Sequence, residues 1–266
     1  MTRLGQSRVV VTGAASGLGR RMALEISRRG GALWLLDLDG EKLARVSEEI
    51  ASAGGSAEAF ACDVSDREAV YDLASRLDEP VDVLINNAGV VSGSSFLEIP
   101  DEKIERSLKV NTLSLFWTTK AFLPGMLERN HGHLVTIASA AGLIGVARLS
   151  DYCASKWAAV GFDESLRVEL KKRGANIKTT VVCPYFVDTG MFEGVESRFS
   201  FLLPIFSEAK LTEKILRAIE ADRPRLFTPP LVHSIAWLRI LPVRWFDAVS
   251  NFMGINDAMD HFVGRK

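Results

Sequence analysis

Three side chains in the middle of the chain have the types and spacing needed for proton transfer. Tyr152 and Lys156 stand four residues apart, and a helix places residues at this spacing on one face. A phenol normally titrates near pH ~10, and a neighbouring ammonium group favours its ionised form. The sequence therefore predicts that Lys156 lowers the pKa of Tyr152 and makes it a usable acid or base. Ser139, upstream, supplies a hydroxyl donor for an oxygen that gains negative charge.

A glycine-rich segment near the N-terminus has the composition of a phosphate-binding loop. It reads Thr-Gly-Ala-Ala-Ser-Gly-Leu-Gly between a predicted strand and a predicted helix. Glycines allow a close approach of the backbone, and the helix N-terminus offers unpaired N–H groups and a positive dipole end to a pyrophosphate. The alternative is a tight turn that binds no ligand. The predicted binding residues in this segment are Gly13, Ser16, Gly17, Leu18 and Gly19.

Asp37, at the end of the next predicted strand, indicates which dinucleotide the loop accepts. A carboxylate roughly 20 residues after the loop can accept hydrogen bonds from the adenosine ribose hydroxyls. The same charge repels a 2′-phosphate, so the sequence favours NAD(H) over NADP(H). Arg20 and Arg21 argue in the other direction, although solvation of a helix face also accounts for both.

Strand and helix patterns alternate through the first two-thirds of the chain. The apolar runs predict strands at residues 8–12, 32–36, 56–61, 81–85, 133–138 and 178–183. Helices are predicted at residues 17–29, 40–53, 66–77, 101–129, 151–172 and 208–221. This alternation predicts an α/β fold, with residues 1–266 forming a single domain on a Rossmann-type, doubly wound parallel sheet.

Composition excludes several classes of function. The 32 Lys and Arg residues nearly balance the 33 Asp and Glu residues, so no global field recruits nucleic acid. Three cysteines, Cys62, Cys153 and Cys183, lack metal-ligand spacing, which predicts no metal site and a reducing compartment. Residues 1–7 contain no apolar run of the signal-peptide type. We therefore expect a cytoplasmic protein without an N-terminal anchor.

Taken together in this order, the motifs of residues 8–190 resemble those of the short-chain dehydrogenase/reductase family. The resemblance implies a catalytic tetrad of Asn111, Ser139, Tyr152 and Lys156. In it Asn111 would hold a proton-relay water and Lys156 would also bond the nicotinamide ribose. The alternatives are that Ser139 caps a helix and that Asn111 satisfies buried backbone groups. The resemblance also implies cofactor contacts from Asp63, Val64, Asn87, Ala88, Gly89, Tyr152, Lys156, Pro184, Val187 and Thr189.

One position departs from the family pattern. Tyr185 stands where the family usually has a glycine after the sixth strand. A tyrosine cannot adopt glycine-only backbone angles without strain. The substitution therefore predicts either a changed local backbone or a tyrosine that walls the substrate cleft.

The last third of the chain is rich in apolar side chains and loses the alternating pattern. Residues 190–225 fall where the family builds its substrate lid, and residues 226–266 form a hydrophobic C-terminal extension. Prolines and the charges of Arg239 and Arg244 argue against a membrane-spanning helix. Tryptophans beside arginines suit peripheral contact with a membrane surface. Packing over the pocket, or against a partner subunit, is an alternative of at least equal weight.

Residues 116–124, 131–133, 152–153 and 187–192 resemble a narrower subgroup, the retinol and 17β-hydroxysteroid dehydrogenases. This implies an oxidoreductase that interconverts a lipophilic alcohol, such as a retinoid, steroid or long-chain alcohol, with its aldehyde or ketone. The alternatives are an NADP-dependent reductase of a small carbonyl compound, a noncatalytic dinucleotide-binding protein and a lipid-surface protein. The family also implies a homodimer or homotetramer, paired through the two longest predicted helices.

Overall fold

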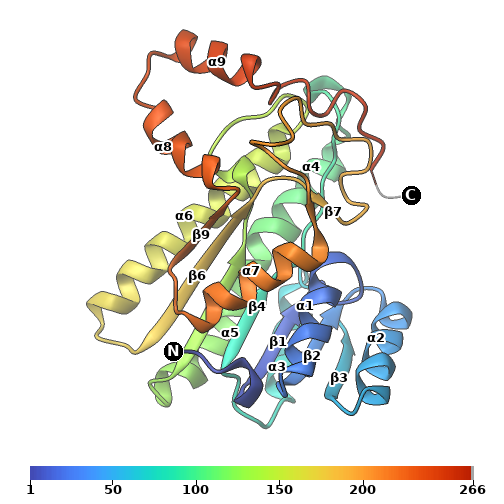
Figure 1. Ribbon diagram of the computed structural model, residues 1–266. Helices are drawn as coiled ribbons and strands as arrows, with labels where there is room; N and C mark the ends of the chain where they lie inside the picture. Colours follow the sequence, from blue (N-terminus) through green and yellow to red (C-terminus); the bar gives the residue numbers. More distant parts are fainter. Residues whose placement is uncertain (265–266) are drawn as a thin grey trace.

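A seven-stranded, wholly parallel sheet forms the centre of the computed structural model, which describes residues 1–264 (Figure 1). The strand order is β3-β2-β1-β4-β5-β6-β9, so the direction of winding reverses between β1 and β4. Its strands are β1 (Arg8–Thr12), β2 (Ala32–Asp37), β3 (Ser56–Ala61), β4 (Val83–Asn86), β5 (Gly132–Ile137), β6 (Ile177–Pro184) and β9 (Arg225–Thr228). The predicted doubly wound α/β fold is confirmed. In such sheets a ligand cleft forms where the winding reverses, at the carboxyl ends of the strands.

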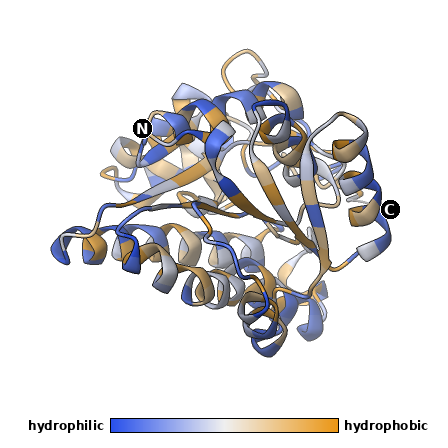
Figure 2. Ribbon diagram, turned by 90° about the horizontal axis from the view of Figure 1, so that it is seen from below, coloured by the Kyte–Doolittle hydropathy of each residue, from blue (hydrophilic) through white to orange (hydrophobic). Residues whose placement is uncertain are grey.

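Helices cover both faces of the sheet, and the strands are apolar on both sides. Adjacent residues of β1 enter opposite cores: Val9 and Val11 pack with helices α1, α2 and α7, whereas Val10 packs with α3, α5 and α6. The helices are α1 (Gly17–Arg28), α2 (Gly40–Ser52), α3 (Arg67–Ser75), α4 (Asp101–Leu108), α5 (Ser114–Glu128), α6 (Ser150–Lys172), α7 (Glu208–Glu220), α8 (Ile235–Leu238) and α9 (Val243–Phe252). Seen from below, the sheet lies between these two helical layers (Figure 2).

Two differences from the predicted elements bear on the site. The helix expected at 101–129 is interrupted by a π-helical segment, Lys109–Leu113, which separates α4 from α5 and carries Asn111. Such a bulge depends on side-chain bonds to other elements, so periodicity alone does not reveal it. The short strand β9 lies inside the segment predicted to start the C-terminal extension, and it pairs with β6 from Val181↔Arg225 to Pro184↔Thr228. Four residues at a sheet edge were too few to give a strand pattern.

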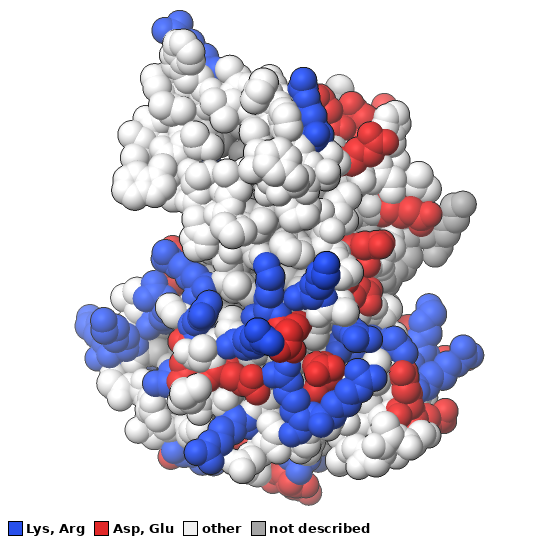
Figure 3. All heavy atoms as spheres, in the orientation of Figure 1, with Lys and Arg blue, Asp and Glu red and all other residues white. Residues whose placement is uncertain are grey.

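The C-terminal extension forms a helical hairpin above the sheet. Helices α8 and α9 lie at the upper left of the molecule, beyond the sheet layer (Figure 1). Charged side chains are sparse over this upper region and dense over the helices below it (Figure 3). Within the part of the chain that the structure describes, no helix is both long and apolar enough to cross a bilayer.

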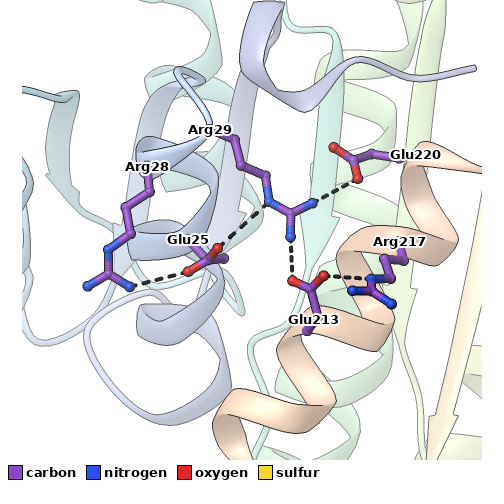
Figure 4. A network of polar contacts seen from close by, with 6 residues as sticks. All are labelled: Glu25, Arg28, Arg29, Glu213, Arg217 and Glu220. Atoms are coloured by element: carbon purple, nitrogen blue, oxygen red, sulfur yellow. Dashed lines mark hydrogen bonds and ion pairs between the residues drawn. The ribbon is translucent and has the colours of Figure 1, made fainter.

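A group of ion pairs fixes α7, the helix that follows the lid, against α1 (Figure 4). Arg29, at the C-terminal end of α1, contacts Glu213 at 2.5 Å and Glu220 at 2.8 Å, both on α7. It also lies 3.9 Å from Glu25 on its own helix. Behind these pairs, Leu211 and Ile215 of α7 are fully buried in the core shared with α1. Residues 208–220 of the predicted lid are therefore part of the helical layer, and a lid in the residues up to β8 (Phe206–Ser207) stays a prediction.

Candidate active site

A cavity of about 1090 Å³ opens at the carboxyl ends of the strands, where the winding reverses. That volume exceeds the range typical of a pocket for one drug-sized ligand, so a dinucleotide and a second molecule can both enter. The structure brings most of the predicted site residues to its wall. They are Gly13, Ser16, Gly17, Leu18, Asp37, Asp63, Val64, Asn87, Ala88, Gly89, Ser139, Tyr152, Lys156, Pro184, Val187 and Thr189. Gly19 and Asn111 lie behind that wall.

The glycine loop fits a pyrophosphate by its backbone geometry. Gly13 has a φ of +66°, and a Cβ there would lie 2.8 Å from the Cα of Ala88. A Cβ on Gly19 would lie only 2.1 Å from the carbonyl oxygen of Gly13, so Gly19 lets α1 pack against the loop. The side chain of Asn87 donates to the carbonyl oxygens of Thr12 and Gly13, at 2.9 and 3.1 Å. These contacts hold the loop at the N-terminus of α1, where an anion is favoured.

Asp37 ends β2 with its carboxylate already anchored. One oxygen accepts from the backbone N–H of Ala15 at 2.9 Å, and the other accepts from that of Asp39 at 3.1 Å. Both acidic residues line the cavity. Asp39 was not among the predicted residues, although its place two residues after Asp37 was a visible signal. Two carboxylates at this wall can accept hydrogen bonds from ribose hydroxyls.

The predicted proton-transfer residues meet at the inner end of the cavity. Ser139 lies two residues after the end of β5, and Tyr152 and Lys156 occupy the first turns of α6. Tyr152 and Lys156 are only 5% and 4% exposed. The Lys156 ammonium donates to the carbonyl oxygen of Ile137 at 2.9 Å and lies 5.6 Å from the centroid of the Tyr152 ring. The end of β5 and the start of α6 thus bring the three side chains together, although Ser139 and Tyr152 are well separated in the sequence.

The electrostatics of Tyr152 differ from the expectation drawn from spacing. Burial raises the pKa of Tyr152, and the group that opposes this increase is the hydroxyl of Ser139, through a hydrogen bond. The Lys156 ammonium donates to the carbonyl oxygen of Ile137, and its predicted lowering of the Tyr152 pKa stays a prediction. Burial also lowers the pKa of Lys156, to about 8. Ser139 thus bonds the Tyr152 phenol and also lines the cavity, where its hydroxyl can reach a substrate oxygen.

Asn111 holds the chain after β4 in place. Its side-chain oxygen accepts from the N–H of Val90 at 2.8 Å. Its amide group donates to the carbonyl oxygen of Val90 and to the hydroxyl of Ser155, both at 2.9 Å. These bonds match the alternative in which Asn111 satisfies buried backbone groups. Its assignment as the holder of a relay water stays a prediction.

Tyr185 lines the cavity, and its backbone does not have the positive φ that would favour glycine. Its N–H donates to the carbonyl oxygen of Thr228 on β9 at 2.9 Å, and its ring lies 4.7 Å from that of Phe186. The side chain lines the cavity. Of the two expectations for this position, the second is therefore confirmed.

The substrate side of the cavity combines apolar residues of the predicted lid with residues of the C-terminal hairpin that no motif indicated. Phe192 and Leu203 come from the lid, with the Phe192 ring 5.7 Å from that of Tyr152. Ile235 and Leu238 of α8, and Val249 of α9, complete the apolar wall. For the three hairpin residues, the only signal in the sequence was a high apolar content. The structure thus shows that the inner face of the C-terminal hairpin packs over the pocket.

A family model described as short chain dehydrogenase matches residues 7–198. Epidermal retinol dehydrogenase 2 of Mus musculus is 44% identical over 264 residues, which are 97% of this chain and 85% of that protein. Retinol dehydrogenase 10-B of Danio rerio is 43% identical over 285 residues, with 97% and 84% of the two chains covered.

Solved structures agree with these sequence relatives. A short-chain dehydrogenase/reductase from Burkholderia phymatum in complex with NAD has a TM-score of 0.82 and 27% identity, over 97% of this chain and 99% of that one. A metagenomic short-chain oxidoreductase in complex with NADP has a TM-score of 0.70 and 30% identity, over 84% and 97% of the two chains. The motifs, the sheet and the relatives lead to one conclusion: the chain belongs to the short-chain dehydrogenase/reductase family, as an NAD(P)-dependent oxidoreductase acting on CH–OH groups.

Proposed function

We propose that this enzyme interconverts a lipophilic alcohol of the retinoid class and its aldehyde, with NAD as the preferred cofactor. The observation that carries the proposal is the apolar wall around the substrate side of the cavity. Lid and hairpin side chains such as Phe192, Leu203 and Ile235 form it, and it leads to Ser139 and Tyr152. Relatives named for retinol dehydrogenase activity support the same substrate class.

The protein's own residues account for the proton chemistry. In reduction, the Ser139 hydroxyl donates a hydrogen bond to the substrate oxygen, and Tyr152 delivers its proton to that oxygen. In oxidation, the ionised form of Tyr152 accepts the alcohol proton. Because burial raises the pKa of the phenol, alkaline pH favours this direction. The Lys156 ammonium donates to the carbonyl oxygen of Ile137 and would also bond the nicotinamide ribose of a bound cofactor. NAD(P), when bound, supplies or accepts the hydride.

The preference for NAD rests on charge. Asp37 and Asp39 both line the cavity beside the glycine loop. The ammonium of Lys42 lies 2.7 Å from the carboxylate of Asp39, so it balances only one of the two charges. A 2′-phosphate placed beside Asp37 would meet like charge, which costs several kcal/mol at close range.

The substrate proposal is tested by measuring NADH formation over a series of primary alcohols of increasing length, with all-trans-retinol included. Each methylene buried in an apolar pocket contributes about 0.8 kcal/mol, so kcat/KM should increase by one or two orders of magnitude over a few carbons. A profile that is flat or decreases beyond short chains would reject the lipophilic substrate. It would favour the alternative of a reductase for a small carbonyl compound.

We also propose that the outer face of the α8–α9 hairpin contacts a lipid surface. Trp237 and Trp245 are 76% and 60% exposed, and Ile240 is 75% exposed between them. The same helices line the cavity with Ile235 and Val249 on their inner side. A hairpin that is apolar on both faces can therefore touch lipid while it walls a pocket for a lipophilic molecule. The three free thiols fit a cytoplasmic enzyme that binds the membrane peripherally.

Flotation with liposomes tests the lipid contact. Replacing Trp237 and Trp245 by serine should reduce the fraction of protein that floats with vesicles. Val168→Ser is the matched control, because Val168 is also an exposed apolar residue, at 56%, but lies on α6 away from the hairpin. Equal flotation of the wild type and the double variant would reject the contact.

We propose in addition that the enzyme pairs through α5 and α6. Phe116 and Trp157 are 41% and 40% exposed on these helices, and the Phe116 ring packs 4.7 Å from that of Phe162. Apolar side chains left half exposed on two adjacent helices are suited to a symmetric interface. Light scattering that shows a monomer at micromolar concentration would contradict this proposal.

A further inference from the structure

Asp151, the residue before Tyr152, is a buried carboxylate that belongs to none of the motifs described above. It lies in the first turn of α6 and is 5% exposed. Burying a charged carboxylate costs free energy unless its oxygens are hydrogen-bonded. The partners of the Asp151 oxygens therefore indicate what this carboxylate does. The helix N-terminus contributes a favourable field at this position.

Both oxygens of Asp151 accept hydrogen bonds from serine hydroxyls on other elements. Oδ1 accepts from Ser92 at 2.7 Å, in the segment that follows β4. Oδ2 accepts from Ser107 at 2.5 Å, near the end of α4, where the serine is 1% exposed. Hydrogen bonds to an ionised acceptor are shorter and stronger than those between neutral groups. The carboxylate therefore ties the start of α6 to two separate segments.

These ties are next to those made by Asn111. Asn111 bonds Val90 on one side and Ser155 on the other, one turn after Asp151. The hydroxyl of Ser155 in turn donates to the carbonyl oxygen of Tyr152 at 2.7 Å. Two successive turns of α6 are thus bonded to the same segment after β4. Tyr152 projects from between these two attachments.

We propose that Asp151 is a positioning residue for the proton transfer. It fixes the rotation of the first turn of α6, and with it the place of the Tyr152 phenol beside Ser139. It also fixes the segment from Val90 to Ser92, whose Val90 lines the cavity. The inference rests on the role proposed for Tyr152 and adds a residue that acts through it.

The primary test is Asp151→Ala, assayed with the alcohol that gives the fastest NADH formation. A displaced catalytic group can cost about 10²-fold, so kcat should decrease ten- to a hundredfold while the Kd for NAD stays nearly unchanged. The apparent pKa in the pH profile of kcat should increase, because Tyr152 loses alignment with the Ser139 hydroxyl that opposes the effect of burial. Asp151→Asn keeps one acceptor and should recover part of the lost kcat.

A matched control separates positioning from general loss of stability. Asp163, about three turns further along α6, is buried to a similar extent, at 2% exposed. Asp163→Ala should lower the Tm and leave kcat close to that of the wild type. Hydrogen exchange of residues 150–156 should become faster in Asp151→Ala and not in Asp163→Ala. Ser107→Ala, which disturbs the fold less, should lower kcat in the same direction, and its effect should not add to that of Asp151→Ala.

The outcomes decide between the two proposals. Wild-type kcat and unchanged exchange in Asp151→Ala would overturn the positioning role, as would an equal loss of kcat in Asp163→Ala. Tyr152→Phe is assayed beside them. If it too keeps full turnover, the proposed function fails with Tyr152. If only Asp151→Ala keeps full turnover, the proposed function stands and this inference fails.

Discussion

The two sides of the cavity are built in different ways. The cofactor side consists of short segments that leave β1, β2 and β4, and its shape is held by bonds such as that from Ala15 to Asp37 and those from Asn87 to the glycine loop. The substrate side consists of the lid and the α8–α9 hairpin, which meet through apolar contacts such as that between the rings of Phe199 and Phe252. Directional bonds fix one geometry, whereas apolar packing tolerates changes of side chain. The chemistry is therefore confined to the bonded side, and substrate choice is left to the packed side.

The largest effect is expected at the border between the two sides. Tyr152→Phe removes the proton donor and should reduce kcat by roughly 10²- to 10⁴-fold, the usual contribution of general acid–base catalysis. NAD affinity, measured by fluorescence titration, should remain nearly intact, because the glycine loop and Asp37 are untouched. Lys156→Ala should lower both turnover and NAD affinity. Turnover of Tyr152→Phe at the wild-type level would contradict the assignment of the two roles.

The next effect is confined to the cofactor side. Asp37→Ala should shift the ratio of kcat/KM for NAD and NADP toward NADP by about one to two orders of magnitude, since a like charge is removed. Asp37→Asn is the matched control for charge, because the amide oxygen can still accept from Ala15. Steady-state kinetics with both cofactors measure the ratio. An unchanged ratio in both variants would mean that Asp37 only braces the loop.

A smaller effect is expected on the substrate side. Ile235→Ala removes apolar surface from the cavity wall, and at about 0.8 kcal/mol per methylene it should lower kcat/KM for a long alcohol by about tenfold. The KM for NAD and the rate with a short alcohol should not change. Trp237→Ala, two residues later on the outer face of α8, should leave vesicle-free kinetics unchanged. A loss for short and long alcohols alike would show that the hairpin also supports the chemistry.

The smallest effect on turnover is expected far from both sides, at His133 near the start of β5. Burial lowers the pKa of His133 to about 4, while its nitrogens contact the hydroxyls of Thr2 and Thr180, both at 2.8 Å. Between pH 6.5 and about 4 the unfolded chain binds a proton here that the folded chain does not, so lowering the pH favours unfolding. The loss approaches about 3 kcal/mol at the acid end.

Urea unfolding across this pH range checks the sign. His133→Gln should lose less stability than the wild type as the pH falls, with kcat at neutral pH retained. Asp163→Asn tests the opposite case, because burial raises the pKa of Asp163 to about 7 and its protonation stabilises the fold as the pH falls. A wild-type slope in the His133 variant would assign the acid sensitivity to other groups.

The amount that could be predicted differs between the same two sides. Residues of the cofactor side lie within a few positions of a strand end, and the local motif around Gly13 to Leu18 predicted residues that the structure places on the cavity wall. The side chains of Ile235, Leu238 and Val249 meet the cavity only because β9 turns the chain back over it. No spacing along the chain encodes that meeting. The apolar content of the C-terminal extension was equally compatible with a cover over the pocket and with contact to lipid, so it could not place these side chains.

The sequence by itself determined the alternating α/β order, the parallel sheet and the set of residues able to bind a dinucleotide and move a proton. These follow from hydrophobic periodicity and from motifs a few residues long. Only the tertiary structure decided that the Ser139 hydroxyl bonds the Tyr152 phenol and that the Lys156 ammonium bonds the carbonyl of Ile137, because both contacts join residues distant in the sequence. It also decided that Tyr185 walls the cavity and that Asp151 joins three segments. Each of these depends on contacts between residues distant in the sequence, which pair only when the sheet is complete.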